Sequence, residues 1–302
     1  MLPRPVFDDV TVCLASHNCR DTIVRAIESA LACAPAAVLV VDDGSTDGTD
    51  AVLRGKAREE PRLHVLFNER NAGVAVVRNR LLAACRTRFL MFLDDDDEAP
   101  ADRIARQRHA FLQVRESLGH DRILCYGARR VEGSGKVLAG LGAGQVVASR
   151  PLYLFATVGL RHPGLRPGLF GTGTLFAAAE PLRALGGFDA NLRRNEDTEL
   201  VIRAAQEGFV CTSVAEVVLH QHPTPGAEKK LAVEFAMRNR ILRKHWKTMM
   251  KTWPLLPAAY FGQSLALRAQ GLSTAAKRGL RALSLLFVNP ADLARHLRSD
   301  RP

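Results

Sequence analysis

Runs of carboxylates follow two apolar stretches of the sequence without a break. Four consecutive aspartates occupy residues 94–97 after the apolar run at residues 89–93, and Asp42 and Asp43 follow the run at residues 38–41. Two like charges about 4 Å apart repel by about 4 kcal/mol at an effective dielectric constant near 20. A divalent cation turns that repulsion into ligation, and oxygen ligands favour Mg²⁺ or Mn²⁺ with substrate phosphate oxygens completing the shell. A solvated acidic turn is the alternative, and the second aspartate pair argues against it.

The elements that must position these carboxylates alternate between strands and helices. Apolar runs typical of buried strands lie at residues 10–15, 37–41, 62–67 and 88–93. Helical patterns separate them at residues 21–32, 47–60 and 73–85, with Asp21 as the expected cap of the first helix. This alternation predicts an α/β fold with a mostly parallel sheet flanked by helices, and ligands of such sheets bind beyond the carboxyl ends of the strands. The sequence "ASHNCR" after the first strand lacks the GxGxxG of dinucleotide-binding folds, so NAD is not expected.

The rest of the chain is less regular. The glycine-rich residues 127–144 predict a hairpin followed by a loop, and the Pro/Gly-rich residues 161–173 predict a second loop. A strand is expected at residues 174–179, a helix at residues 196–209, and basic helices near the end of the chain. We therefore expect a catalytic domain over residues 1–227 and a basic helical extension over residues 228–302.

The positive charge of this 302-residue chain is concentrated at its end. From Glu228 onward there are 15 Lys and Arg against 4 Asp and Glu, which accounts for the whole net charge of +11. Within that extension, an apolar stripe is formed by Ala276, Leu280, Leu283 and Phe287. The opposite, basic face is formed by Lys277, Arg278 and Arg281. This pattern predicts an interfacial helix on an anionic membrane, and packing of the stripe on the catalytic domain is the alternative. Few aromatic residues interleave the basic ones, so nucleic acid is not an expected partner.

The cysteines and the apolar segments bear on location. None of the six cysteines forms a CxxC pair, which indicates reduced thiols in the core rather than disulfides or a zinc site. The N-terminal residues lack an apolar stretch of signal-peptide length, and no segment approaches the roughly 20 apolar residues of a membrane-spanning helix. We expect a cytoplasmic protein, in peripheral contact with the inner face of the cell membrane.

Five short motifs occur in an order and spacing that resemble a known family. They are "VVDDGSTDGT", "NAGVAVVRN", "FLDDDDE", "LGGFD" and "NEDTEL", within residues 10–223. Together they resemble family-2 glycosyltransferases with the GT-A fold, which bind nucleotide sugars. The resemblance implies an inverting glycosyltransferase that uses Mn²⁺ or Mg²⁺, a nucleotide-sugar donor, and a glycan or lipid-linked acceptor.

The same resemblance implies a role for particular residues. Nucleotide and donor binding falls on Ala15, Ser16, Asn18, Asp43, Asn71, Gly73, Arg78, Asp94, Asp95, Gly171 and Thr172. Asp43 would accept a hydrogen bond from uracil, and Asp197 would be the general base. The family's D-x-D pattern falls on Asp94 and Asp96, and Asp96 and His222 would hold the metal ion. Asp197 is expected to open a helix, whose N-terminal end favours an ionised carboxylate. The chain departs from the family pattern at three places, with Ala15 for its proline, His17 for its tyrosine, and Leu219-His220 for its Tyr-Arg pair.

Each of these roles has a simpler structural alternative. Asp42 could cap the turn that follows it, and Arg78 could be an ordinary arginine on a helix surface. Asp197 could be a first-turn helix acid, and His222 could be a loop residue. For the whole chain, the alternatives are a catalytically silent nucleotide-sugar-binding protein docked on a membrane glycan-assembly complex, and a nucleotidyltransferase. The intact Glu196-Asp197 pair argues against the first, and the lack of a glycine-rich phosphate loop near the N-terminus argues against the second.

Overall fold

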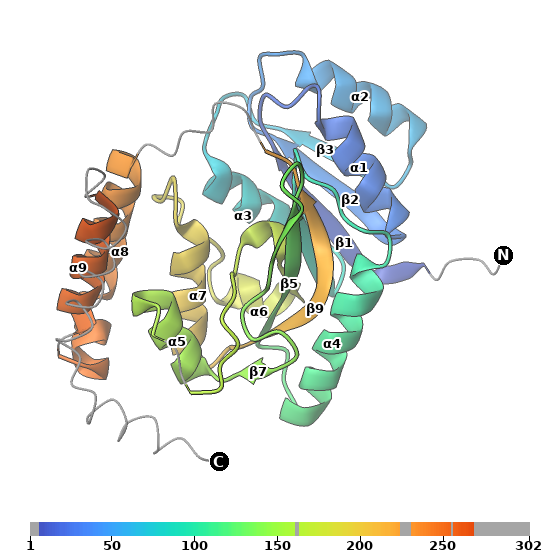
Figure 1. Ribbon diagram of the computed structural model, residues 1–302. Helices are drawn as coiled ribbons and strands as arrows, with labels where there is room; N and C mark the ends of the chain where they lie inside the picture. The colour runs from blue at the N-terminus through green and yellow to red at the C-terminus, as the bar shows by residue number, and fades with distance from the viewer. Residues whose placement is uncertain (1–5, 161–162, 224–230, 255, 269–302) are drawn as a thin grey trace.

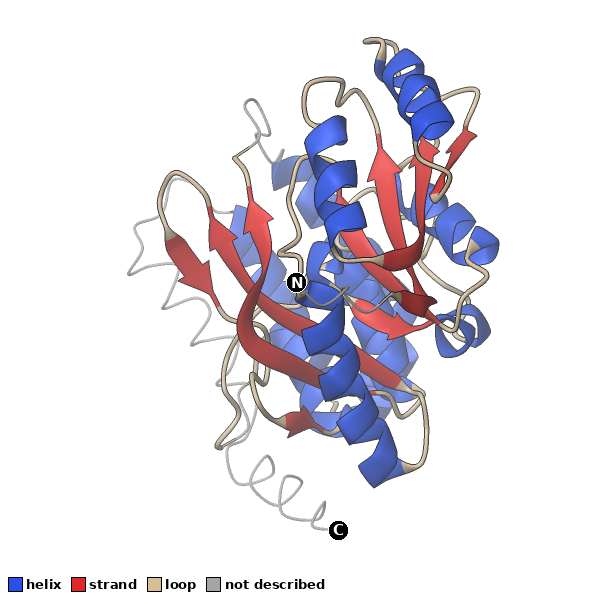
Figure 2. Ribbon diagram, turned by 90° about the vertical axis from the view of Figure 1, so that its right-hand side faces the viewer, coloured by secondary structure: helices blue, strands red, loops and turns tan. Residues whose placement is uncertain are grey.

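The computed structural model describes residues 6–160, 163–223, 231–254 and 256–268 (Figure 1). Their strands form one nine-stranded sheet in the order β3-β2-β1-β4-β8-β5-β9-β7, with β6 paired to β5. Figure 2 shows this twisted sheet running between helices. The predicted α/β fold with helices on both faces of a central sheet is confirmed.

The first half of the sheet is parallel, as the sequence predicts. Its strands are β1 (Phe7–Ser16), β2 (Pro35–Asp42), β3 (Leu63–Phe67) and β4 (Phe89–Asp94). The connecting helices are α1 (Ile23–Ala32), α2 (Thr49–Glu59) and α3 (Val74–Ala84). One detail was predicted wrongly. Helix α1 begins two residues after Asp21, and the N-cap position is Thr22, without a side-chain capping hydrogen bond.

The second half of the sheet is mixed. Strand β8 (Phe176–Ala178) runs antiparallel to both β4 and β5 (Ile123–Val131), so β4 and β5 point the same way. The long strand β9 (Val210–Gln221) is parallel to β5, and β7 (Val146–Val147) is antiparallel to β9. Strand β6 (Lys136–Leu138) forms the predicted hairpin with β5. As a result, the carboxyl ends of β1, β2, β4, β5 and β9 face one edge of the sheet.

Several helices have no counterpart among the sequence predictions. They are α4 (Arg103–Leu118), α5 (Ser149–Val158), α6 (Ala179–Ala184) and the short 3₁₀ helix η1 (Thr172–Thr174). The predicted helix that carries Asp197 is α7 (Glu196–Gln206).

Two apolar layers form the core, one on each face of the sheet. Alternate residues of β1 enter different layers, because neighbouring side chains of a strand point to opposite faces. Val12 packs in the layer under α1, α2 and α4, whereas Cys13 packs in the layer that includes α3, α6 and α7. All six cysteines are free thiols, and five of them are buried, as the sequence predicts.

The basic extension begins with two helices, α8 (Leu231–Thr252) and α9 (Leu256–Arg268), which lie beside α5 and α7 in Figure 1. Apolar side chains of both helices, such as Ile241 and Tyr260, are fully buried in the same layer as α5 and α7. The predicted interfacial helix at residues 273–287 lies outside the described residues. None of the described helices is both long enough and apolar enough to cross a membrane.

Candidate active site

The turn after β2 holds the two aspartates of the first motif in different roles. Asp42 caps the turn, because its Oδ2 accepts a hydrogen bond of 3.1 Å from the backbone N–H of Ser45. Asp43 faces the loop before α3, where its carboxylate accepts backbone N–H bonds from Ala72 (2.9 Å) and Gly73 (2.8 Å). The side-chain amide of Asn68 donates to it as well, at 2.7 Å. Asp43 is therefore only 3 % exposed, and it anchors this loop to the end of the strand.

The close approach of this loop explains the glycine of the turn. Gly44 has a φ of 67°, and a Cβ there would lie 2.7 Å from the Cα of Arg70 and 3.0 Å from the backbone nitrogen of Asn71. Any other residue would push the loop away. Gly73 follows at the N-cap position of α3, at a φ of 96° that also favours glycine. Asn71 is exposed at this edge of the sheet.

The end of β1 is tied to the ends of its neighbours. In the sheet register, Ala15 lies between Val41 and Asp94. Ser16 is buried, whereas Asn18 is exposed and uses its Oδ1 to accept a 2.8 Å hydrogen bond from the backbone of Thr46. His17 is exposed, and its Nδ1 contacts the carbonyl oxygen of Asp43 at 3.0 Å.

The four aspartates after β4 have different surroundings. Asp95 accepts a 3.0 Å hydrogen bond from the backbone of His17, and burial raises the pKa of Asp95 to about 6. Asp97 is 2 % exposed, and burial, followed by repulsion from Asp94, raises the pKa of Asp97 to about 8. Asp94, Asp95 and Asp96 remain partly exposed, so Asp97 is the only buried member of the four. Both aspartates of the D-x-D pattern, Asp94 and Asp96, are therefore accessible.

The loop before β8 is shaped around Asp94. A Cβ on Gly173 would lie 2.4 Å from Oδ2 of Asp94, so only glycine leaves room for this carboxylate. Next to it, the Thr172 side chain is 5 % exposed, and its hydroxyl finds no hydrogen-bond partner among the described residues. A buried hydroxyl without a partner costs free energy, and a bound ligand would satisfy it.

Arg78 connects the strand edge to α7. Its guanidinium lies 2.5 Å from Oε1 of Glu196 and 3.2 Å from Oδ1 of Asp94. Arg78 is only 7 % exposed, which excludes an ordinary arginine on a helix surface. Glu196 precedes Asp197 in the first turn of α7. The guanidinium of Arg78 therefore holds the D-x-D region and the region of the proposed base together.

Asp197 is partly exposed, and its Oδ1 accepts a 2.6 Å hydrogen bond from the backbone of Thr198. Burial, followed by repulsion from Glu196, raises the pKa of Asp197 to about 6. The sequence analysis expected the helix N-terminus to keep this carboxylate ionised, and burial acts in the opposite direction by favouring the protonated form. A carboxylate with a pKa close to the working pH is suited to general-base catalysis.

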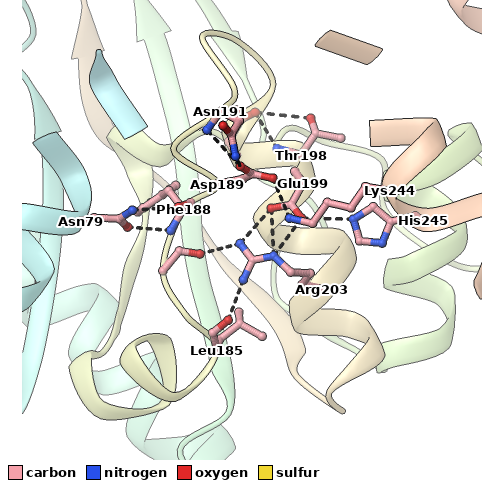
Figure 3. A network of polar contacts seen from close by, with 12 residues as sticks. Asn79, Leu185, Phe188, Asp189, Asn191, Thr198, Glu199, Arg203, Lys244 and His245 are labelled. Atoms are coloured by element: carbon pink, nitrogen blue, oxygen red, sulfur yellow. Dashed lines mark hydrogen bonds and ion pairs between the residues drawn. The ribbon is translucent and has the colours of Figure 1, made fainter. Parts of the chain in front are cut away.

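A buried polar network holds α7 in place (Figure 3). Glu199 is fully buried and receives ion-pair contacts from Arg203 at 2.8 Å, Lys244 at 2.7 Å and His245 at 3.1 Å. Lys244 also reaches Asp189, at 2.6 Å, in the turn after α6. The helix that carries Asp197 is thereby joined to α8 through Glu199, which is only two positions away from the proposed base.

Some residues of the site carried no role in the sequence analysis. Nε2 of His222 lies 2.7 Å from Oε1 of Glu98, and Arg25 lies 3.2 Å from the same oxygen. Glu98 is the last residue of the "FLDDDDE" motif, and its place in that motif is the one sequence feature that could have identified it as a site residue. Arg129 on β5 lowers the pKa of Asp97, and its buried Nε has no hydrogen-bond partner among the residues that the structure describes. No local sequence pattern marks this arginine.

The oxygen atoms at this edge of the sheet are suited to bind the expected metal ions, although the described residues do not by themselves complete a metal site. No group of three or more His, Cys, Asp or Glu side chains among them could hold a metal ion. Asp94 and Asp96 supply carboxylate oxygens, and the backbone N–H of His222 bonds to Asp97 at 2.8 Å, which brings the end of β9 to the same loop. Mg²⁺ and Mn²⁺ sites often rely on one or two carboxylates together with substrate phosphates, so such a set fits them.

Comparison with known proteins agrees with this description. Solved structures similar to the chain include Staphylococcus aureus TarS (residues 1–349) in complex with UDP-GlcNAc, with a TM-score of 0.63 and 16 % identity over 92 % of this chain and 79 % of that one. The mannosyltransferase PcManGT from Pyrobaculum calidifontis, in complex with GDP-Man and Mn²⁺, gives a TM-score of 0.54 and 17 % identity over 96 % of this chain and 84 % of that one. The fold is therefore the GT-A glycosyltransferase fold.

The sequence comparisons agree with this fold. Residues 11–127 match the family model described as glycosyl transferase family 2. The succinoglycan biosynthesis protein ExoO of Rhizobium meliloti is 44 % identical over 100 residues, 32 % of this chain and 28 % of the relative. TuaG of Bacillus subtilis, a putative teichuronic acid biosynthesis glycosyltransferase, is 37 % identical over 106 residues, 34 % of this chain and 42 % of the relative. The chain thus spans less than half of the length of these two relatives.

Proposed function

We propose that the protein is an inverting glycosyltransferase that moves a sugar from a nucleoside-diphosphate donor, of the UDP-sugar type, to a hydroxyl of a glycan or lipid-linked acceptor. The observation that carries this proposal is the shared contact of Arg78 with Asp94 and Glu196. It keeps Asp197, next to Glu196, beside the strand ends where donors bind in open α/β sheets. The similarity to TarS, solved with UDP-GlcNAc, supports a nucleotide-sugar donor.

In the proposed reaction, the residues at the ends of β1 and β2 bind the nucleotide, and Thr172 donates to the sugar or diphosphate. Asp94 and Asp96, together with phosphate oxygens of the donor, would hold a Mn²⁺ or Mg²⁺ ion, which would supply positive charge to the departing diphosphate. His222 would be a further ligand once its Nε2 leaves Glu98. Asp197 accepts the proton of the acceptor hydroxyl as that oxygen attacks the anomeric carbon. A single in-line displacement then inverts the configuration of that carbon.

Two variants test this assignment because they affect different steps. We expect Asp197→Asn to lower sugar transfer, or donor hydrolysis without an acceptor, by roughly 10²–10⁴-fold while UDP affinity stays near that of the parent. Asp96→Ala should weaken metal-dependent UDP binding as well as turnover. A silent nucleotide-sugar binder would have no turnover to lose. Full activity in Asp197→Asn would move the base to Glu196 or Asp189, and lost UDP binding would place the Glu-Asp motif in the donor site.

We further propose a role in polysaccharide biosynthesis at the inner face of the membrane. The printed names of ExoO and TuaG, which place those relatives in succinoglycan and teichuronic acid biosynthesis, support the first part. The basic extension supports the second, because Lys and Arg near an anionic bilayer are attracted to it. Flotation with liposomes, with and without anionic lipid, tests the association. Absence of the protein from both lipid fractions would leave the extension with a packing role alone.

A further inference from the structure

A basic pocket lies between α8 and the turn that precedes α7. It has a volume of about 710 Å³, and its charged lining residues are Asp189, Arg203, Arg240, Arg243 and Lys244. Figure 3 shows Asp189, Arg203 and Lys244 facing one another at this junction. The volume is within the range of roughly 300–1,000 Å³ that is usual for ligand pockets.

Two of the pocket's cations are available to a ligand. Lys244 and Arg203 are already paired with the buried carboxylate of Glu199. Arg240 and Arg243, by contrast, are exposed, and their side chains form no hydrogen bond or ion pair with any described residue. Guanidinium groups bind phosphate oxygens in a two-pronged geometry, so this pair is suited to a phosphate or diphosphate.

An apolar groove continues from this pocket along the same helix pair. Trp246, Met250 and Phe261 line it and are 49 %, 39 % and 41 % exposed, and its volume is also about 710 Å³. Arg243 lines both the pocket and the groove. Because Arg243, Trp246 and Met250 recur at helical spacing, the basic and apolar parts form one face of α8. Exposed large apolar side chains gathered in this way mark an interaction site.

We propose that this face binds one amphiphile, with its phosphate-bearing head between Arg240 and Arg243 and its hydrocarbon chain along Trp246, Met250 and Phe261. The charge of the pocket and the apolar character of the groove each match one part of such a molecule. The proposal rests on the proposed function and names its acceptor class, a sugar linked to a lipid phosphate. Lys244, which lines the pocket, contacts Glu199 at 2.7 Å, so the head binds against the helix that carries Asp197.

Binding of farnesyl diphosphate to the full chain, measured by calorimetry, tests this proposal. Both parts of the probe should contribute, so inorganic pyrophosphate and farnesol should each bind at least about tenfold more weakly. The double variant Arg240→Gln/Arg243→Gln should lose at least about tenfold in affinity for farnesyl diphosphate, because two charge-assisted contacts are removed. Trp246→Ala/Phe261→Ala should weaken binding of farnesyl diphosphate but not of pyrophosphate.

A matched control separates a specific site from general attraction to anionic surfaces. Lys247 and Lys251 are exposed on the same helix and line neither the pocket nor the groove. Lys247→Gln/Lys251→Gln removes the same charge and should keep farnesyl diphosphate affinity within about twofold, since no contact is lost. Equal losses in the two charge variants, or binding to phosphatidylglycerol vesicles without farnesyl diphosphate binding, would overturn the proposal in favour of a membrane-facing surface.

UDP binding in the presence of Mn²⁺, measured on the same samples, keeps this proposal distinct from the proposed function. A parent chain that binds UDP but not farnesyl diphosphate would overturn the amphiphile site and leave the transferase function standing. A parent chain that binds farnesyl diphosphate but not UDP would support the site and overturn the transferase function.

Discussion

Arg78 and Glu196 form a largely buried ion pair, with 2.5 Å between a guanidinium nitrogen and a carboxylate oxygen. The two residues come from α3 and from the first turn of α7, which are 118 positions apart in the chain. The second arm of the guanidinium reaches Asp94 at the end of β4. Three motifs that are distant in the sequence therefore depend on one side chain for their relative positions.

Replacing this arginine should be costly to stability. Arg78→Gln leaves Glu196 buried without its cation, and breaking such a pair by removing one partner typically costs about 3–5 kcal/mol. UDP binding should weaken as well, because Asp94 loses a partner. Arg88→Gln is the matched control, since Arg88 forms an exposed pair with Asp121 and should cost at most about 1 kcal/mol. Equal unfolding free energies for the two variants in denaturant titrations would contradict this role of Arg78.

The pH dependence of activity should reveal the environment of Asp197. Its raised pKa of about 6 means that the protonated, inactive form accumulates as the pH falls below 6, whereas an ordinary aspartate would stay ionised to about pH 4. We expect kcat/KM, which reports the ionisation of the free enzyme, to fall about tenfold for each pH unit below 6. The residual rate of Asp197→Asn should not show this fall below pH 6. A parent profile that stays level down to pH 4.5 would show that another group is the base.

The parts of the fold that the sequence predicts are those set by local pattern. Buried parallel strands give continuous apolar runs, so the strands that end at Ser16, Asp42 and Asp94 could be placed, together with the polar residues after them. The clustering of those residues followed from the general position of ligands in parallel sheets.

The remaining features depend on contacts between distant segments. The contact of Glu199 with His245 joins residues 46 positions apart, and nothing in either local sequence indicates it. The same holds for Arg129, which lies in a strand with no functional pattern. The raised pKa of Asp197 could not be predicted for a related reason, because it depends on burial by segments that the helix pattern does not reveal.

The network around Glu199 should contribute strongly to stability. Burial opposes ionisation, yet hydrogen bonds from His245, Arg203 and Lys244 lower the pKa of Glu199 to about 2. Glu199→Gln deprives Arg203 and Lys244 of their carboxylate partner and should lower the free energy of unfolding by about 3–5 kcal/mol. Glu180→Gln serves as the control, because the Glu180 side chain is 81 % exposed beside Arg183 and should change stability by less than about 1 kcal/mol. Indistinguishable melting curves for the two variants would contradict the role of the network.

Nucleotide binding should depend on a divalent cation. The partly exposed carboxylates of Asp94 and Asp96 face the edge where a diphosphate is expected, and they would repel it without a cation between them. UDP affinity measured by calorimetry should rise by at least about tenfold when EDTA is replaced by Mn²⁺, since such an ion typically contributes several kcal/mol of charge stabilisation.

The dependence on the cation should follow the D-x-D pattern and not the acidic charge in general. Asp96→Ala should remove most of the gain from Mn²⁺. Asp121→Ala should keep that gain, because Asp121 pairs with Arg88 and Arg115 away from the strand ends. Uridine, which has no phosphate, should bind equally in Mn²⁺ and EDTA, because the cation acts through the diphosphate oxygens. Equal UDP affinity in Mn²⁺ and EDTA for the parent chain would overturn the metal assignment.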